Sequence, residues 1–179
     1  MRITSGKHKG RVLYAPTSLP VRPTTDFAKQ ALFNILTNTI DLKKICFLDL
    51  FAGTGNISYE MASRGCNSIT CVDLQADCIN YIKETAFKLN INGIACYTTD
   101  VAHFLKSNTN KFDVIFADPP FDFEKIIEIP NWIFESKVLA KNGIFILEHF
   151  SKIKFTNYSE LYNERNYGKL NFSFFKSPT

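Results

Sequence analysis

Short apolar runs alternate with helical patterns along most of this sequence. The runs are rich in β-branched and aromatic residues and predict buried strands at 45–51, 68–73, 94–99, 112–117 and 143–149. The segments between them predict helices at 56–64, 75–91, 101–107 and 123–137. Strands separated by helices imply βαβ crossovers, so we expect an α/β fold whose mostly parallel sheet carries helices on both faces.

The two ends of the chain depart from this alternation. Thr24 and Thr25 can cap a helix that runs to about Asn38. Its apolar positions form one stripe that we expect to face the core: Phe27, Ala31, Leu32, Ile35 and Leu36. Near the other end, 154–162 and 169–175 predict two strands joined by the turn-rich segment 163–168, so an antiparallel hairpin is expected to complete the sheet.

The predicted strand at 112–117 ends at Asp118-Pro119-Pro120-Phe121. The two prolines donate no backbone hydrogen bond and fix φ, so the chain leaves the sheet in a stiff turn. There the Asp118 carboxylate and the Pro119 carbonyl could accept hydrogens from the exocyclic amine of a nucleobase while Phe121 stacks on the base. A strand-ending turn with an exposed aromatic residue is the simpler interpretation of these residues alone.

A glycine turn follows the first predicted strand. Gly53 and Gly55 allow close backbone approach to a bound cofactor, and Phe51 lies in the same turn. Ser58 stands where the dinucleotide fingerprint has its third glycine. Asp49 would repel a pyrophosphate but attract the cationic amino-acid end of S-adenosylmethionine, so this turn predicts that cofactor.

Two more predicted strands end in acids. Asp73 follows the glycine turn by about 20 residues, the spacing at which a carboxylate reaches a ribose hydroxyl, with Leu74 beside it; Asp73 could also cap the next helix. Asp100 could accept from an adenine amino group while Val101 packs on the ring, or it could equally cap the helix that follows. Parallel strands end at one edge of a sheet, so we expect the acids to converge there: Asp49, Asp73, Asp100 and Asp118.

With these residues in view, the chain resembles a class I S-adenosylmethionine-dependent methyltransferase, and more narrowly the bacterial family that methylates N2 of one guanine in 16S ribosomal RNA. The narrow resemblance rests on segments spread over nearly the whole chain: 1–7, 10–11, 22–26, 31–34, 49–55, 63–65, 118–121 and 167–168. Gln30 departs from the family, which usually has an acid there, and Asp73 replaces a more frequent Glu.

The resemblance implies a Rossmann-like methyltransferase fold, S-adenosylmethionine as cofactor, and guanine 966 of the small-subunit RNA as target, either in free RNA or in an assembled 30S subunit. The tetrad 118–121 would hold the guanine amine during direct methyl transfer. Two alternatives remain open on the residues: an adenine-N6 methyltransferase acting on DNA or RNA with the same tetrad, and a non-catalytic RNA-binding or dinucleotide-binding domain.

Composition and charge leave the role of the first residues open, and the family resemblance favours an RNA contact there. At 179 residues and 45% hydrophobic, the protein has room for one domain and no separate recognition module. Five cations and no acid precede Asp26: Arg2, Lys7, Lys9, Arg11 and Arg22. We therefore expect a basic extension at 1–23 that contacts phosphates and a catalytic domain at 24–179, although a solvated terminus has the same composition.

Cysteines and histidines suggest no further chemistry. The five cysteines show no Cys-x-x-Cys pairing and predict reduced, buried side chains, with no disulfide and no metal site. The three histidines fall on different predicted elements, and His149 is expected to be partly exposed and hydrogen-bonded. No signal peptide or membrane-length apolar run is seen, so we expect a cytoplasmic monomer without a membrane partner.

Overall fold

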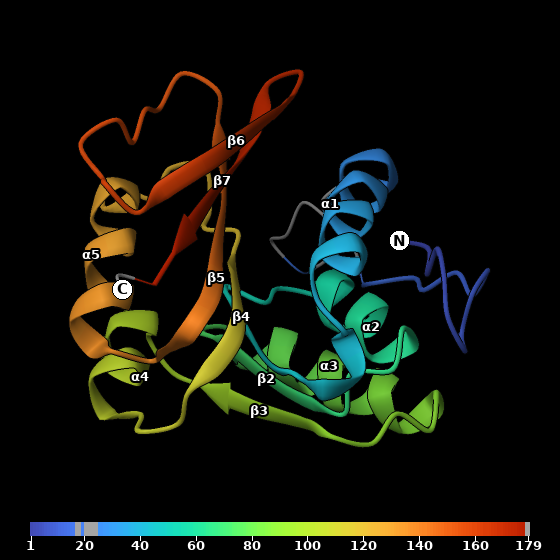
Figure 1. Cartoon of the computed structure of the whole chain (residues 1–179). Coiled ribbons are helices and arrows are strands. Elements are labelled where there is room, and N and C mark those ends of the chain that lie inside the picture. Colours follow the sequence, from blue (N-terminus) through green and yellow to red (C-terminus); the bar gives the residue numbers. More distant parts are fainter. Residues whose placement is uncertain (17–18, 20–24, 178–179) are drawn as a thin grey trace.

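A computed structural model describes residues 1–16, 19 and 25–177 of the protein, and a single seven-stranded sheet organises them (Figure 1). The strand order is β3-β2-β1-β4-β5-β7-β6. The strands are β1 (Cys46–Leu50), β2 (Ser68–Asp73), β3 (Ile94–Thr98), β4 (Phe112–Ala117), β5 (Leu139–Phe150), β6 (Leu161–Tyr167) and β7 (Leu170–Lys176). Strands β1 to β5 run parallel, and β7 pairs antiparallel with both β5 and β6. The expected α/β sheet with a C-terminal hairpin is confirmed.

Helices cover both faces of this sheet, with α1, α2 and α3 on one side and α4 and α5 on the other (Figure 1). They are α1 (Asp26–Thr39), α2 (Asn56–Ser63), α3 (Ala76–Lys88), α4 (Val101–Ser107) and α5 (Ile129–Ser136), with short 3₁₀ turns η1 (Leu42–Lys44) and η2 (Ile126–Glu128). Successive strand residues therefore enter different cores: Phe116 packs toward the first group of helices and Ile115 toward the second. Burial on both faces explains why inner strands such as β4 read as continuous apolar runs.

The buried face of helix α1 differs from the apolar stripe expected from the sequence. Thr25 caps it, accepting a hydrogen bond from the Ala28 backbone N–H at 3.2 Å, while Thr24 lies outside the described residues. The buried face consists of Ala28, Lys29, Leu32, Phe33 and Leu36. Phe27 is 73% exposed, so its assignment to the core was wrong. The shift arises because a buried lysine, Lys29, takes part in contacts that no apolar pattern reveals.

Two boundaries in the second half of the chain also differ from expectation. Helix α5 begins at Ile129, six residues after the expected start, because Pro130 favours the first turn of a helix and the preceding residues form a turn and η2. Strand β5 begins at Leu139, four residues early. Leu139 pairs with Phe112 before a register shift brings Ile144 opposite Val114.

The C-terminal hairpin has its turn later than expected. Residues 163–166, interpreted as a turn because they are polar, belong to strand β6, and the chain reverses at Gly168, whose φ is +72°. β6 is the edge strand of the sheet, where polar and charged side chains face water and discourage pairing with another chain. The expected first hairpin strand at 154–162 is therefore wrong for all but its last residues.

The start of the chain folds back on itself and docks on α2. Arg2 and Val12 form an antiparallel bridge, and Ile3, only 2% exposed, exchanges backbone hydrogen bonds with Gly10 and Arg11. We call residues 1–13 the N-terminal hairpin. The backbone is therefore held in place, in contrast to a freely solvated terminus.

The remaining expectations concern cysteines and membrane contact. All five cysteines are free; Cys66, Cys71 and Cys78 are buried, and the other two are partly exposed. Among the residues that the structure describes, no helix is long and apolar enough to cross a membrane.

Candidate functional site

The carboxyl ends of β1, β2 and β4 lie side by side at one edge of the sheet. Leu50 of β1 pairs with Val72 of β2 on one side and with Ala117 of β4 on the other. The residues that follow, Asp73 and Asp118, therefore flank the turn after β1. Two backbone hydrogen bonds hold the segments together, from Ala52 N to Val72 O at 3.0 Å and from Asp118 N to Leu50 O at 3.4 Å.

The turn after β1 has a backbone shape that few sequences accept. Phe51, Gly53 and Gly55 all have positive φ, at 56°, 51° and 77°. A bulky aromatic residue in this region is strained, and such strain concentrates at functional sites. Gly55 is the N-cap of α2 and makes no side-chain hydrogen bond to the helix, so the start of α2 faces the same edge as the glycine turn.

Asp73 holds this turn together. One carboxylate oxygen accepts from the Gly53 backbone N–H and the other from that of Gln75, both at 2.8 Å. The side chain thus secures the glycine turn and the start of α3 at the same time. Each carboxylate oxygen has a second lone pair, so Asp73 can also accept hydrogen bonds from ligand hydroxyls. Leu74, 65% exposed, follows it at the same edge.

Asp49 lies below the turn, inside the protein. It is 2% exposed and accepts a hydrogen bond of 2.6 Å from the Ser58 hydroxyl. Burial raises the pKa of Asp49 to about 7, and the Ser58 hydrogen bond opposes that rise. Ser58, which replaces the third glycine of a dinucleotide fingerprint, therefore sets the environment of this carboxyl group.

The third strand end, after β3, carries the N-cap of α4. The Asp100 side chain caps α4 by accepting from the His103 backbone N–H at 3.0 Å, as one of its two interpretations predicted. Val101, the first residue of α4, is 3% exposed and packs in the core on that side of the sheet. The structure places both residues near the edge without testing their expected contact with adenine.

The proline turn after β4 carries an aromatic pair. Pro119 is buried, Asp118 is half-buried, and Phe121 is 45% exposed. The Phe121 ring stacks on Phe150 at the end of β5, with centroids 4.3 Å apart and planes inclined by 30°. Sequence reasoning missed Phe150, although its position after an apolar strand was a signal.

A second aromatic contact ties the proline turn to the glycine turn. Phe123 packs edge-to-face against Phe51, with centroids 5.2 Å apart, and against Trp132 of α5 at 6.1 Å. The Phe123 backbone N–H also bonds the Pro120 carbonyl at 2.9 Å. Phe123, another residue that sequence reasoning missed, therefore couples the two motifs that were expected to bind different ligands.

The expected phosphate contacts lie on the N-terminal hairpin. Arg2, Lys7, Lys9 and Arg11 are exposed, and Arg22 lies outside the described residues. The hairpin backbone binds the end of α2: Lys7 N donates to Ser63 O at 2.7 Å, and the Ser63 hydroxyl donates to Ser5 O. The charges are therefore displayed from a fixed backbone.

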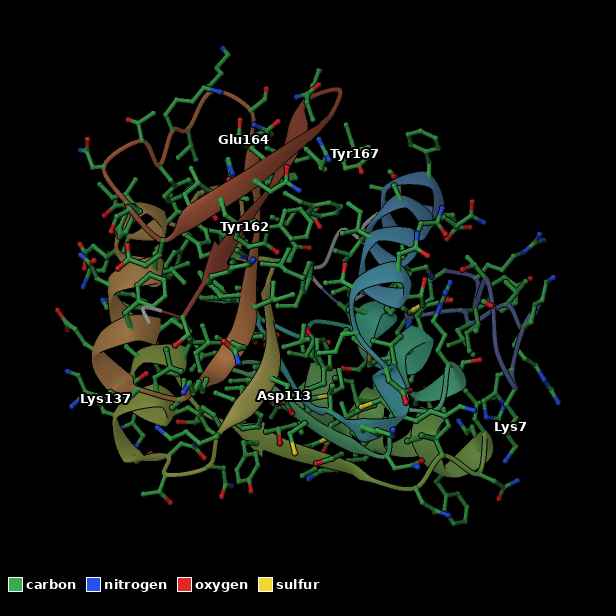
Figure 2. All side chains as sticks on the ribbon, in the orientation of Figure 1. Lys7, Asp113, Lys137, Tyr162, Glu164 and Tyr167 are labelled. Atoms are coloured by element: carbon green, nitrogen blue, oxygen red, sulfur yellow. The ribbon has the colours of Figure 1, made fainter. Side chains whose placement is uncertain are left out.

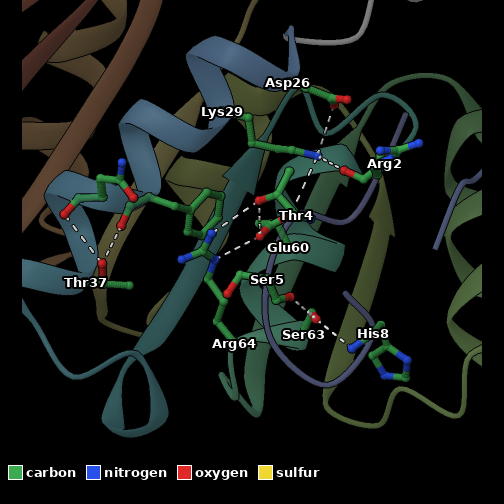
Figure 3. A network of polar contacts seen from close by, with 12 residues as sticks. Arg2, Thr4, Ser5, His8, Asp26, Lys29, Thr37, Glu60, Ser63 and Arg64 are labelled. Atoms are coloured by element: carbon green, nitrogen blue, oxygen red, sulfur yellow. Dashed lines mark hydrogen bonds and ion pairs between the residues drawn. The ribbon is translucent and has the colours of Figure 1, made fainter. Parts of the chain in front are cut away.

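Buried ionic groups anchor this hairpin (Figure 3). Glu60 of α2 accepts from the Thr4 backbone N–H at 2.7 Å, the Thr4 hydroxyl at 2.8 Å and Arg64 Nε at 2.9 Å. Lys29 of α1 donates to the Arg2 carbonyl at 2.5 Å and to Asn56 Oδ1 at 2.8 Å. Burial lowers the pKa of Lys29, and the carboxylates of Glu60 and Asp26 oppose that shift. Because Asn56 directly follows Gly55, the network joins the hairpin to the glycine turn.

The structure also shows where possible metal ligands and His149 lie among the described residues. The described residues contain no group of three or more His, Cys, Asp or Glu side chains that could hold a metal ion. His149 is 2% exposed, so the expected partial exposure was wrong. Its Nε2 lies 2.7 Å from the buried Ser173 hydroxyl and its Nδ1 lies 2.8 Å from the Phe150 carbonyl, so the expected hydrogen bonding is present.

Comparison with known proteins shows the family to which this chain belongs. The family described as Conserved hypothetical protein 95 matches residues 1–176. The chain belongs to this family. A curated relative, the ribosomal RNA small subunit methyltransferase D of Buchnera aphidicola subsp. Baizongia pistaciae, is 30% identical over 148 residues, covering 83% of this chain and 75% of the relative.

Solved structures show the same fold. A hypothetical protein of Thermus thermophilus superposes with a TM-score of 0.84 at 26% identity, covering 98% of each chain. An RNA methyltransferase of Salinibacter ruber, in complex with S-adenosyl-L-homocysteine, has a TM-score of 0.70 at 11% identity, covering 88% of this chain and 94% of its own. The family member described here therefore has the Rossmann-like fold of methyltransferases.

Proposed function

We propose that this protein is an S-adenosylmethionine-dependent methyltransferase that modifies N2 of one guanine, at position 966, in 16S ribosomal RNA. The observation that carries the proposal is the adjacency of the glycine turn and the turn Asp118-Pro119-Pro120-Phe121 on neighbouring strand ends. The Buchnera relative is named as a small-subunit ribosomal RNA methyltransferase, which supports the substrate class.

The residues around the glycine turn suit S-adenosylmethionine. Asp73 would accept from the ribose hydroxyls, and the N–H groups at the start of α2 would face the amino-acid end. Asp49, whose pKa burial raises to about 7, would be stabilised in its charged form by an ammonium group nearby. Phe51, Leu74, Asp100 and Val101 complete the proposed cofactor surface. The Salinibacter structure, which holds S-adenosyl-L-homocysteine on the same fold, supports this assignment.

The proline turn would hold the base. The cofactor supplies a sulfonium-bound methyl group that is already activated, so the protein chiefly has to orient the acceptor. The Asp118 carboxylate and Pro119 carbonyl would accept the amine hydrogens of guanine. This favours a pyramidal nitrogen, whose lone pair attacks the methyl carbon in line as the carbon–sulfur bond breaks. A proton then leaves the nitrogen for Asp118 or for water.

The target base has to leave its stack to reach this turn. Phe121, 45% exposed and supported by Phe150, offers a ring on which the base plane can rest. Arg2, Lys7, Lys9 and Arg11 of the N-terminal hairpin, with Arg22, would bind backbone phosphates of the same RNA. The protein would act in the cytoplasm as a monomer, on free RNA or on the 30S subunit.

The deciding experiment is nucleoside mass spectrometry. Cells that lack the protein should lose one N2-methylguanosine from 16S RNA, and expression of the wild-type protein should restore it. Asp118→Ala should not restore it, whereas Asp122→Ala, which removes an exposed acid four residues further along, should. Appearance of N6-methyladenosine on incubation with DNA or RNA would instead establish the adenine methyltransferase, and absence of any methylated product would refute the proposal.

A further inference from the structure

A row of aromatic residues leads away from the proline turn along the end of the sheet. Phe150 of β5 and Tyr167 of β6 both pair with Leu170 of β7, the strand between them. Directly paired residues of antiparallel strands point to the same face of a sheet. Phe121 stacks on Phe150 at one end, and Tyr167 meets Phe27 of α1 edge-to-face at the other, with centroids 6.0 Å apart. We call Phe121, Phe150, Tyr167 and Phe27 the aromatic row.

Phe27, at the far end of this row, lies outside the core. Phe27 is 73% exposed, while the buried face of α1 lies on other residues of the helix. Tyr167 extends from the C-terminal hairpin of β6 and β7 toward α1 (Figure 2). Its ring also packs on the buried Phe172, with centroids 5.4 Å apart. Among the described residues Phe27 contacts the Tyr167 ring, and most of its surface remains in water, which favours a binding role over a packing role.

Positive charge surrounds the same corner of the molecule. Arg165 lies two residues before Tyr167 on β6 and therefore shares its face of the strand. Lys169 follows the hairpin turn, and a backbone hydrogen bond from Ser151 N to Lys169 O at 2.9 Å brings Lys152 close to that turn. All three cations are exposed. Exposed rings beside cations are the combination that binds single-stranded nucleic acid, because bases stack and phosphates pair.

We propose that the aromatic row is a stacking surface for the single-stranded nucleotides next to the methylated guanine. This inference rests on the proposed function, because the aromatic row extends outward from Phe121, the residue proposed to stack on the target base. The target base would lie against Phe121, and an adjacent base of the strand would stack on Phe27 and Tyr167. Arg165, Lys169 and Lys152 would bind the connecting phosphates.

The test is binding of a short 16S RNA fragment that contains the guanine and its flanking nucleotides, measured by fluorescence anisotropy with S-adenosylhomocysteine present. Phe27→Ala and Tyr167→Ala should each weaken binding by about fivefold or more, as expected for loss of one base-stacking contact. The affinity for S-adenosylhomocysteine should stay the same. Phe27→Tyr and Tyr167→Phe should bind as the wild type does, because they keep the ring.

A matched control and the salt dependence distinguish base stacking by the aromatic row from phosphate binding and from the general effect of losing an exposed ring. Phe87 is 85% exposed near the end of α3, at the opposite end of the strands, and Phe87→Ala should leave RNA binding unchanged. Since stacking releases no counterions, the alanine variants of the row should keep the wild-type salt slope, whereas Lys169→Ala should lower it.

The outcomes distinguish the two proposals. If the wild-type protein methylates the RNA but Phe27→Ala and Tyr167→Ala both bind it within twofold of wild type, the stacking surface is overturned and the function stands. If the wild type neither binds nor methylates the RNA, both are overturned. Tyr167 packs on Phe172, so if Tyr167→Ala does not fold, Phe27→Ala alone decides, because its ring is mostly solvent-exposed.

Discussion

At the scale of single residues, four aspartates near one sheet edge have different surroundings. Asp49 is buried beside Ser58, Asp73 accepts from two backbone N–H groups, Asp100 caps a helix, and Asp118 is half-buried in a proline turn. Their environments, more than their shared residue type, determine which can hold a cofactor and which can meet a substrate. Replacing three of them should therefore have three different effects.

Asp118→Ala should abolish methyl transfer and leave cofactor affinity unchanged, because its proposed partner is the guanine amine. Single-turnover rates on the RNA and calorimetry with S-adenosylhomocysteine measure the two effects. Phe121→Ala should cost less, about 1–3 kcal/mol through lost stacking, and Phe121→Tyr should be nearly silent. Near-normal single-turnover rates in Asp118→Ala would contradict the role of the whole turn.

Asp73→Ala should weaken S-adenosylhomocysteine binding by tenfold or more, since charge-assisted hydrogen bonds to the ribose contribute about 1.5–3 kcal/mol. The variant should also melt at a lower temperature, because the backbone N–H groups of Gly53 and Gln75 lose their acceptors. Asp77→Ala, an exposed acid in the first turn of α3, is the control and should do neither. Unchanged affinity in a folded Asp73→Ala protein would remove this residue from the site.

Asp49 should make the ligand-free protein less stable as the pH rises. Its pKa is about 7 in the folded state and near 3.8 in the unfolded chain, so between these values the folded state holds the extra proton. This contribution to stability is complete below about pH 4 and declines as the pH approaches 7. In Asp49→Asn the decline should be absent, as measured by urea unfolding at pH 5 and pH 8. The same pH dependence in both proteins would show that Asp49 is already ionised.

At the scale of elements, docking of the N-terminal hairpin on α2 is the least expected feature. Gly6 has a φ of +80° and lies so close to α2 that an added Cβ would come within 1.8 Å of the Ser63 carbonyl oxygen. Glu60 and Lys29 hold the same contact from inside the protein. Contacts with α2 and α1 therefore fix the backbone of the N-terminal hairpin, from which the exposed cations project.

Gly6→Ala should release the hairpin from α2 and weaken RNA binding, while S-adenosylhomocysteine still binds at the strand ends. Gly10→Ala is a matched control: its φ of +86° is equally unfavourable for alanine, but an added Cβ meets nothing within 4 Å. Both variants carry the backbone cost of about 1–2 kcal/mol, and only Gly6→Ala adds the clash. Equal RNA affinities of the two variants would show that docking does not matter for recognition.

At the scale of the whole molecule, the surfaces proposed to bind cofactor and RNA surround one edge of the sheet. The parallel strands bring the glycine turn and the proline turn together, and the antiparallel hairpin extends the edge with aromatic and basic residues. The net charge of +4 is modest, so under the proposed function we expect the distribution of charge, more than its total, to direct RNA to this edge.

Replacing Lys7, Lys9 and Arg11 together by alanine should weaken RNA binding and flatten its dependence on salt. Each lost phosphate contact should reduce the slope of log K against log salt by about 0.7 for a single strand. Cofactor affinity should not change, and stability should change little, because exposed charges contribute little to folding. Wild-type affinity and slope in the triple variant would place recognition elsewhere, with the hairpin of β6 and β7 as the next surface to examine.

The sequence by itself determined the order of the elements, the edge where the acids meet, and the two turns that carry the proposed chemistry. These depend on local features: apolar runs, glycines that accept positive φ, and prolines that end a strand. Only the tertiary structure decided that Phe27 faces water, that residues 163–166 form an edge strand, and that Phe150 supports Phe121. It also decided that Lys29 and Glu60 bury their charges under the N-terminal hairpin. The contacts of Phe150, Lys29 and Glu60 depend on partners distant in the chain, and local patterns do not identify the distant segment that supplies such a contact.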